Sequence, residues 1–366
     1  MLVDLSSISY VPILSVRPAE MIGLRELPEA AKRLMLPHIL LRPWLGGGTL
    51  KRATDKIIHS CSKSPFIIEL DTDYPVEGNT DVAQEMISLR DKEHGFRKWL
   101  EFVRNLPLAI PCLQVTSDIA ELTSEIAGAA SLRRGIVVRI PKHSLAAIDV
   151  FCSIFANKGI ADVLFVIDFE QSDYRYLVEI SRAITAIERI RQFIPTASIA
   201  ISSTSFPSSF KEVTQQEIFE RSFFNGVLSE IHRTTGLLYS DRGSARLPRE
   251  GGGGVPAPRI DLPSADTWYF FRKEVDGIGD PTAKVKERLE AYKEIAGAAI
   301  ASAEWNPKLN IWGTQMIKLT QLGSEYGITS PVRSTSARIN IHLFKQALRT
   351  SRVPLDQLTE DDWVDL

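Results

Sequence analysis

The stretch Asp162–Glu170, with the sequence DVLFVIDFE, is a short apolar run that ends on two carboxylates, Asp168 and Glu170. Because side chains alternate along a strand, Val166, Asp168 and Glu170 share one face, and the large apolar residues between them share the other. A strand that is apolar on both faces is typical of a parallel sheet covered by helices. Acidic side chains at the carboxyl end of such a strand indicate a ligand site, because α/β proteins usually bind ligands there.

The same alternation of strand and helix repeats on both sides of this stretch. The candidate strands are Tyr10–Val16, His38–Trp44, Pro65–Asp71, Ile110–Val115, Gly135–Ile140, Asp162–Phe169, Ser198–Ser203 and Leu237–Ser240. The helix-like segments between them are Glu20–Met35, Thr49–Cys61, a charged region with a break near His94 that runs to Asn105, Asp118–Leu132 with Ser117 as its N-cap, Leu145–Asn157, Tyr174–Phe193 and Gln215–His232. Eight such units in about 240 residues predict an α/β protein with a (β/α)8 barrel of the TIM type. An open doubly wound parallel sheet is the alternative.

The pattern changes after residue 240, so we predict a barrel over residues 1–240 and a C-terminal elaboration packed on it over residues 241–366. The segment Asp241–Arg259 contains four consecutive glycines and is predicted to be a mobile surface loop. A late strand and three helix-like segments are then expected at Thr267–Arg272, Thr282–Glu304 with Asp280-Pro281 as its start signal, Thr314–Leu322 and Ala337–Arg349, before the acidic end Thr359–Leu366.

Composition and charge narrow the class of protein. Of the 366 residues, 44% are hydrophobic and 24% charged, and the formal net charge of −2 gives no global attraction to nucleic acid or to anionic membranes. The three cysteines, Cys61, Cys112 and Cys152, are widely spaced in apolar surroundings, which indicates buried reduced thiols rather than a disulfide framework or a zinc site. Because the first residues lack the pattern of a signal peptide and no apolar run is long enough to span a membrane, we expect a cytoplasmic protein.

Four carboxylates follow two of the predicted strands. Glu69 and Asp71 share one face of the third strand, as Asp168 and Glu170 do in the sixth. If both pairs point into the mouth of a barrel, Glu69, Asp71 and Asp168 can hold a divalent metal ion. They can instead divide acid and base roles in hydrolysis, with Asp168 and Glu170 as the catalytic carboxylates.

Two arginines belong to the same ends of the predicted strands. Arg42 and Arg139 can bind a phosphate or offset the acidic charge, and Arg139 completes the candidate catalytic set. The alternative is structural, because buried charges must be partnered and Glu69 with Arg139 can form an ion pair that fills the barrel. Asp168 is expected to face inward at the end of a central strand and to pair with a cation such as Arg139.

Three further features bear on possible ligand sites. Ser203 lies in a run of hydroxyl side chains at the end of the seventh strand, where barrels often bind phosphate, although such runs also start helices. Arg272 ends an aromatic strand that offers a stacking surface for bases, although aromatic strands more often belong to the core. The six histidines show no HxH or HExxH spacing, which argues against a zinc enzyme.

Several short segments, in order along nearly the whole chain, resemble one known family. They are YVPILSVRPAEMIGLREL, GIVVRIPK, VLFVIDFEQ, ISSTSFP, YSDRGSAR, DTWYFFR, IWGTQMI and ARINIHL. The chain is similar in these segments to the Beta protein family of temperate phages, phage satellites and bacterial mobile elements. It departs from the family pattern at Arg242, after the ligand-binding candidate Asp241, and at Thr314. The resemblance implies accessory cargo of a mobile element, some of which excludes competing phages, and it supplies no catalytic residue.

These observations lead to two main hypotheses. The first is a barrel scaffold that acts in phage exclusion through a protein partner encoded by the same mobile element. The alternative is a metal-assisted hydrolase of a phosphate ester or nucleotide that acts at the barrel mouth. A nucleic-acid binder ranks third, because only a clustered face of Arg242, Arg246, Arg249 and Arg272 would support it.

Overall fold

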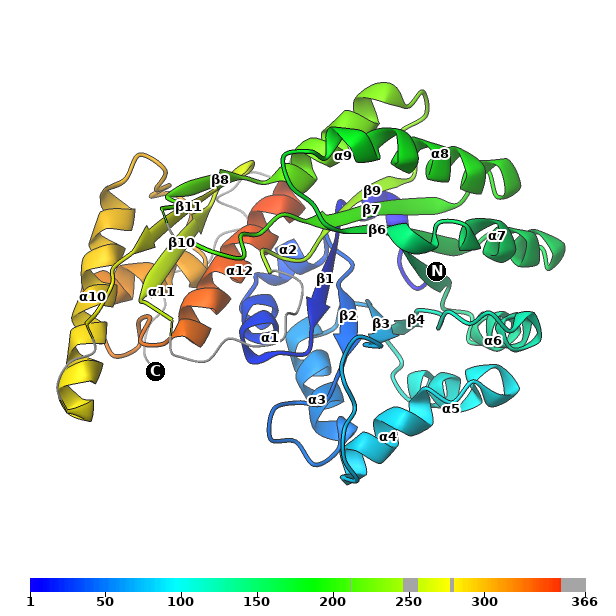
Figure 1. The fold of residues 1–366 in the computed structure, drawn as a ribbon, viewed down its shortest axis with the longest axis horizontal. Coiled ribbons are helices and arrows are strands. Elements are labelled where there is room, and N and C mark those ends of the chain that lie inside the picture. Colours follow the sequence, from blue (N-terminus) through cyan, green and yellow to red (C-terminus); the bar gives the residue numbers. More distant parts are fainter. Residues whose placement is uncertain (211, 246–255, 277–279, 350–366) are drawn as a thin grey trace. The chain divides into compact units, whose positions relative to one another are not determined.

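Eight parallel strands form a nearly closed ring in the computed structural model (Figure 1). The structure describes residues 1–210, 212–245, 256–276 and 280–349. The ring strands are β1 (Tyr10–Ser15), β2 (His38–Leu41), β3 (Phe66–Leu70), β4 (Ala109–Pro111), β5 (Ile136–Pro141), β6 (Val163–Gln171), β7 (Ser198–Thr204) and β9 (Leu237–Asp241). Their spatial order, β4-β3-β2-β1-β9-β7-β6-β5, is the chain order of a TIM-like barrel.

The ring closes between β4 and β5. Cys112 forms a single parallel bridge with Val137, and the Leu113 N–H donates to the Val137 carbonyl oxygen at 2.9 Å. These contacts join the two ends of the strand order, so the chain has the predicted barrel rather than the open doubly wound sheet.

The alternation predicted for the opening stretch is present in β6. Val166 packs inside the ring with Val11, Leu40 and Ile67 from other strands. Phe165 faces the helices, and its ring lies 5.9 Å from that of Phe155. Both faces of β6 are therefore buried, and the parity of the strand sends Asp168 to the inside.

The helices of the barrel unit are α3 (Leu50–Cys61), α4 (Asp81–Leu89), α5 (Glu93–Arg104), α6 (Ile119–Ser131), α7 (Ala147–Asn157), α8 (Leu177–Phe193) and α9 (Phe219–Glu230), with short 3₁₀ turns at Leu5–Ser7 and Lys142–Ser144. The expected break near His94 is confirmed, because His94, Gly95 and Phe96 have non-helical backbone angles. The N-cap expected at Ser117 is wrong. Asp118 caps α6 instead, since its carboxylate accepts hydrogen bonds from the N–H groups of two first-turn residues, Ala120 and Glu121.

The described chain divides into two compact units. The barrel unit comprises Met1–Arg17, Arg33–Ser205 and Phe219–Arg242, and the second unit comprises residues 18–32, 206–218 and those from Gly243 on. The expected helix Glu20–Met35 is thus replaced by α1 (Pro18–Arg25) and α2 (Glu29–Lys32) of the second unit. Pro28 separates them, because proline is disfavoured inside a helix. The boundary at residue 240 stays a prediction.

The second unit contains a three-stranded antiparallel sheet. Its strands are β10 (Arg259–Pro263), β11 (Thr267–Arg272) and β8 (Gln215–Glu217), and its later helices are α10 (Pro281–Ala301), α11 (Trp312–Gln321) and α12 (Pro331–Leu348). The aromatic strand and the helix start at Asp280-Pro281 are as expected. Residues 215–217, predicted as the beginning of a helix, form a strand that pairs with β11. Most of the predicted loop and the acidic end Thr359–Leu366 lie outside the described residues.

Candidate functional site

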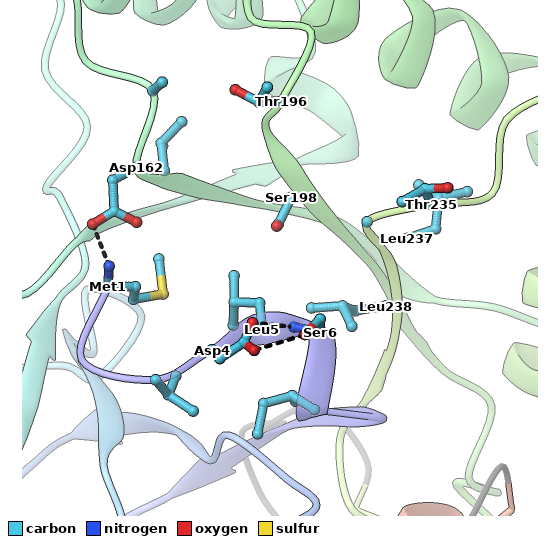
Figure 2. A pocket seen from close by; sticks show the side chains of 15 residues that line it. Met1, Asp4, Leu5, Ser6, Asp162, Thr196, Ser198, Thr235, Leu237 and Leu238 are labelled. Atoms are coloured by element: carbon cyan, nitrogen blue, oxygen red, sulfur yellow. Dashed lines mark hydrogen bonds and ion pairs between the residues drawn. The ribbon is translucent and has the colours of Figure 1, made fainter.

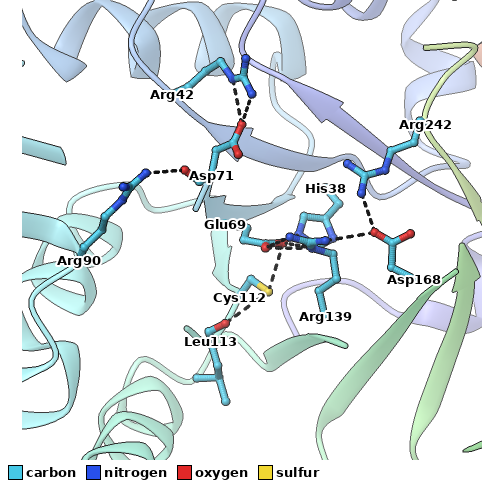
Figure 3. Close-up of polar contacts among 10 residues, drawn as sticks. All are labelled: His38, Arg42, Glu69, Asp71, Arg90, Cys112, Leu113, Arg139, Asp168 and Arg242. Carbon is cyan, nitrogen blue, oxygen red and sulfur yellow. Dashed lines mark hydrogen bonds and ion pairs between the residues drawn. The ribbon is translucent and has the colours of Figure 1, made fainter. Parts of the chain in front are cut away.

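A buried polar cluster lies inside the ring, where hydrophobic side chains would otherwise be expected. Its members come from successive strands or their ends, and we call it the barrel cluster: His38, Glu69, Cys112, Arg139, Asp168 and Arg242 (Figure 3). Each of these six residues exposes a tenth or less of its surface or of its side chain. Ionised groups at this depth must be partnered, so their contacts decide what the cluster can do.

Arg139 and Glu69 form the central pair of the barrel cluster. The Arg139 Nε donates to both Glu69 carboxylate oxygens at 2.9 Å, and its Nη2 donates to Oε1 at 2.6 Å. Burial alone would raise the pKa of Glu69, but the guanidinium and the neighbouring His38 outweigh it and hold that pKa far below its usual value. Glu69 is therefore ionised and bound to Arg139, which agrees with the structural alternative drawn from the sequence.

Asp168 faces inward and accepts hydrogen bonds from two arginines, which confirms the expected pairing with Arg139. The donors to its Oδ2 are Arg139 Nη1 at 3.1 Å and Arg242 Nη2 at 2.6 Å, and its Oδ1 accepts the Glu170 N–H at 2.9 Å. Burial would raise the pKa of Asp168, but the two guanidinium groups lower it below its usual value. Arg242 thus belongs to the barrel cluster.

Glu170 does not join the other three carboxylates. The ladder between β6 and β7 shifts register after Asp168, and Glu170 has a φ of 58°, a left-handed conformation that is uncommon for residues other than glycine. Its Oε1 lies 3.6 Å from Nδ1 of His143, which is an exposed residue. The bulge therefore separates Glu170 from Asp168, and the catalytic pair proposed from the sequence does not share one pocket.

Arg42 and Asp71 form a second pair at the carboxyl ends of β2 and β3 (Figure 3). The Arg42 Nε donates to Asp71 Oδ2 at 2.9 Å, and the guanidinium lies over the Tyr74 ring at 5.0 Å. Arg90 donates to the backbone carbonyls of Asp71 and Tyr74 at 3.0 and 2.7 Å. Glu69, Asp71 and Asp168 each accept a hydrogen bond from an arginine, and the metal site proposed at these three carboxylates stays a prediction.

Two of the predicted ligand residues face away from the barrel interior. Ser203 and Asp241 are register partners on β7 and β9, and Asp241 accepts hydrogen bonds from the Tyr10 hydroxyl and, at 2.7 Å, from the Tyr239 hydroxyl. The Arg221 guanidinium lies 3.2 Å over the Tyr239 ring. We call this group, which also contains Ser205 and Glu220, the outer cluster: Tyr10, Ser203, Ser205, Glu220, Arg221, Tyr239 and Asp241.

Burial governs the charge state of Glu220 in the outer cluster. Its carboxyl accepts a hydrogen bond from the Ser205 hydroxyl, but burial and the nearby Asp241 raise its pKa to about 8. Glu220 is therefore largely protonated at neutral pH, unlike Glu69 and Asp168.

The remaining candidates belong to the second unit or lie outside the described residues. Arg272 donates to the Phe210 carbonyl oxygen at 2.7 Å and pairs with Glu274. Trp268 and Phe270 of the aromatic strand are buried in a small core of that unit, so they are not free to stack on bases. The arginine face that would support nucleic-acid binding cannot be assembled from the described residues, because Arg242 is buried in the barrel and Arg246 and Arg249 are outside them.

Sequence reasoning missed His38 and Cys112. The His38 Nε2 lies 2.6 Å from Glu69 Oε2, and the Cys112 Sγ lies 3.7 Å from the same oxygen. Strand parity was the available signal, because His38 shares the inward face of β2 with Leu40, and Cys112 shares that of β4 with Ile110. A search for ligands at short fixed spacing along the chain cannot find a group whose members come from different strands.

A separate hollow of about 720 Å³ lies at the opposite end of the strands (Figure 2). The beginnings of β6, β7 and β9 line it together with the segment from Met1 to Ile8. In TIM barrels this amino-terminal face serves stability, and catalytic groups gather at the other end. We therefore place no reaction in this hollow.

The comparisons with known proteins agree with the resemblance noted in the sequence. The family model described as Beta protein matches residues 10–348. The chain belongs to the Beta protein family. One relative is Protein beta of Enterobacteria phage P4, which is 27% identical over 345 residues that make up 92% of each chain. No solved structure matches the chain significantly, and no helix in the described parts of this Beta family protein is long and apolar enough to cross a membrane.

Proposed function

We propose that this Beta family protein is an accessory protein of a mobile genetic element, a barrel scaffold that acts in phage exclusion through a protein partner encoded by the same element. Its similarity to a phage P4 protein over 92% of both chains supports the mobile-element context. The observation that carries the scaffold role is the pairing inside the ring: Glu69, Asp168 and Asp71 are all bound by arginines. Carboxylates bound in this way are less available to a substrate, and removing one partner of such a buried pair destabilises the fold.

An exposed apolar segment beside the carboxyl end of β6 supports the protein partner. Tyr174, Leu177 and Val178 are 71%, 66% and 72% exposed, which is unusual for three large apolar residues so close in sequence. They adjoin a pocket of about 290 Å³ lined by Lys142, Arg175 and neighbours. Exposed apolar residues with a polar rim are typical of protein interaction sites.

Co-purification from cells that express the chain with its neighbouring genes tests this proposal. The wild type should recover a protein encoded by the element, and the variant Leu177→Glu/Val178→Glu should lose it, because charges in the apolar segment oppose docking. Leu322→Glu is a matched control, since Leu322 is 77% exposed in the second unit. Phage plating should follow the same order, with exclusion kept by the wild type and the control.

Two results would contradict the proposal. One is recovery of the chain alone while its neighbours are present in the same lysate. The other is a double variant that stays folded, by circular dichroism, and keeps both the partner and the exclusion of phages.

The metal-assisted hydrolase of a phosphate ester or nucleotide gains no support from the described residues. Glu69 and Asp168 share Arg139, Asp71 is bound to Arg42, and Glu170 lies apart. We therefore do not adopt it as a second function.

A further inference from the structure

Three side chains of the types that bind transition metals converge inside the barrel. They are His38 on β2, Glu69 on β3 and Cys112, which follows β4 directly (Figure 3). An imidazole nitrogen, a carboxylate oxygen and the thiol sulfur all lie within 4.8 Å of one another. Two strands and the residue after a third thus bring three different ligand atoms close together.

Hydrogen bonding accounts for only part of this convergence. The His38 Nε2 lies 2.6 Å from Glu69 Oε2 and interacts with that carboxylate, but the geometry is poor for a hydrogen bond. The His38 Nδ1 has no hydrogen-bond partner among the described residues, although His38 is fully buried. The Cys112 thiol, 3.7 Å from the same oxygen, is a weak donor. A buried imidazole without a well-formed partner is rare, because its desolvation is then uncompensated.

The donor set indicates a particular class of ion. Thiolate sulfur and imidazole nitrogen suit zinc and similar transition metals, and magnesium and calcium prefer oxygen ligands alone. Burial lowers the pKa of His38, which favours the neutral imidazole that binds metals.

We propose that His38, Glu69 and Cys112 bind a zinc-like divalent transition-metal ion inside the barrel. Arg139 is then a positioning residue, because it donates to Glu69 Oε1 at 2.6 Å and holds the carboxylate. The ion links β2, β3 and the chain after β4, close to the single bridge that completes the ring at Cys112. This role is structural and is independent of the proposed function.

Metal analysis of the purified chain tests the proposal. The protein is expressed with added zinc, purified without chelators and measured by mass spectrometry, and it should carry about one ion per chain. Cys112→Ser should lose most of this metal. Cys61→Ser and Cys152→Ser are matched controls, because both thiols are also buried but lie outside the group, and they should keep it.

A second measurement covers the case in which Cys112→Ser does not fold. Wild-type chain refolded with cobalt alone should show a thiolate-to-cobalt charge-transfer band, and wild type refolded without metal should not. Absence of metal from the wild type after both expression with zinc and refolding with cobalt would overturn the proposal. So would a folded Cys112→Ser that keeps as much metal as the two controls.

Discussion

The barrel cluster and the outer cluster are both buried, yet Glu220 of the outer cluster and the carboxylates Glu69 and Asp168 of the barrel cluster are in opposite charge states. Inside the ring, Glu69 and Asp168 are bound by arginines, and their pKa values are lowered. Outside it, Glu220 accepts a serine hydroxyl hydrogen bond, and its pKa is raised to about 8. Burial alone therefore does not set the charge of a carboxyl group, because its partners decide whether it stays ionised.

Breaking the ion pair between Arg139 and Glu69 in the barrel cluster should have the largest effect on stability. Arg139→Met leaves the Glu69 carboxylate buried without its guanidinium, although Asp168 keeps Arg242. We expect the free energy of unfolding to fall by about 3–5 kcal/mol, because an unpaired buried charge is left behind. Urea denaturation measures this change. A loss below about 0.5 kcal/mol, the usual range for surface substitutions, would mean that the pair is not part of the structural core.

The neutral carboxyl of Glu220 in the outer cluster should make the stability of the protein depend on pH. In the unfolded chain Glu220 releases its proton near the ordinary glutamate pKa of 4.5, but in the folded chain it keeps the proton up to about pH 8. The folded state therefore binds the additional proton between these values, and wild-type stability falls as pH rises through this window.

Glu220→Gln removes that dependence, because glutamine does not titrate. From pH 5 to pH 8 the variant should gain stability relative to wild type by on the order of 2–3 kcal/mol. Denaturation at both pH values checks this, with Glu101→Gln as an exposed control that should show little change. A relative gain in the opposite direction would show that Glu220 is ionised in the folded protein.

Asp168→Asn removes one negative charge from the barrel cluster while keeping the size of the side chain. We expect a loss of about 1–3 kcal/mol, since the charge-assisted bonds from Arg139 and Arg242 are weakened. Phage exclusion should decline only in proportion to the amount of folded protein. A variant that remains as stable as wild type but loses all function would instead identify Asp168 as a ligand-binding residue.

Asp241→Asn should have the smallest effect of the four. Its side chain keeps one oxygen to accept from Tyr10 or Tyr239, so a loss of about 1 kcal/mol is expected in thermal or chemical unfolding. Ser203→Ala is the matched control on the neighbouring strand, because the buried Ser203 hydroxyl has no hydrogen-bond partner among the described residues. If the control is the more destabilising of the two, the assigned contacts of Asp241 are wrong.

The sequence predicted the scaffold better than the site. Parity in VLFVIDFE was enough to place Asp168 inside the ring, because the strand is long and apolar on both faces. The strand LLYSD is short and mixed, so nothing in it distinguished the inward Ser240 from the outward Asp241. The grouping of His38 with Glu69 and Cys112 depends on the stagger between strands around a closed ring, which no spacing along the chain records.

The β10 strand was also missed, for a local reason. It ends on Pro263 and follows other prolines closely, so its residues have the composition of a loop. β10 is a strand because it pairs with β11, and no residue pattern in the sequence indicated this pairing.

A double-mutant cycle on Glu69 and Arg139 tests most directly whether the barrel interior is a charge-compensated structural network. Glu69→Gln, Arg139→Met and the double variant are compared with wild type by urea denaturation. Each single variant leaves the other member of the pair buried without its partner, and the double variant removes both. The double variant should therefore be more stable than the sum of the two losses predicts, by about 2 kcal/mol or more. Losses that add to within about 0.5 kcal/mol would show that the two residues are energetically independent, and would contradict the network.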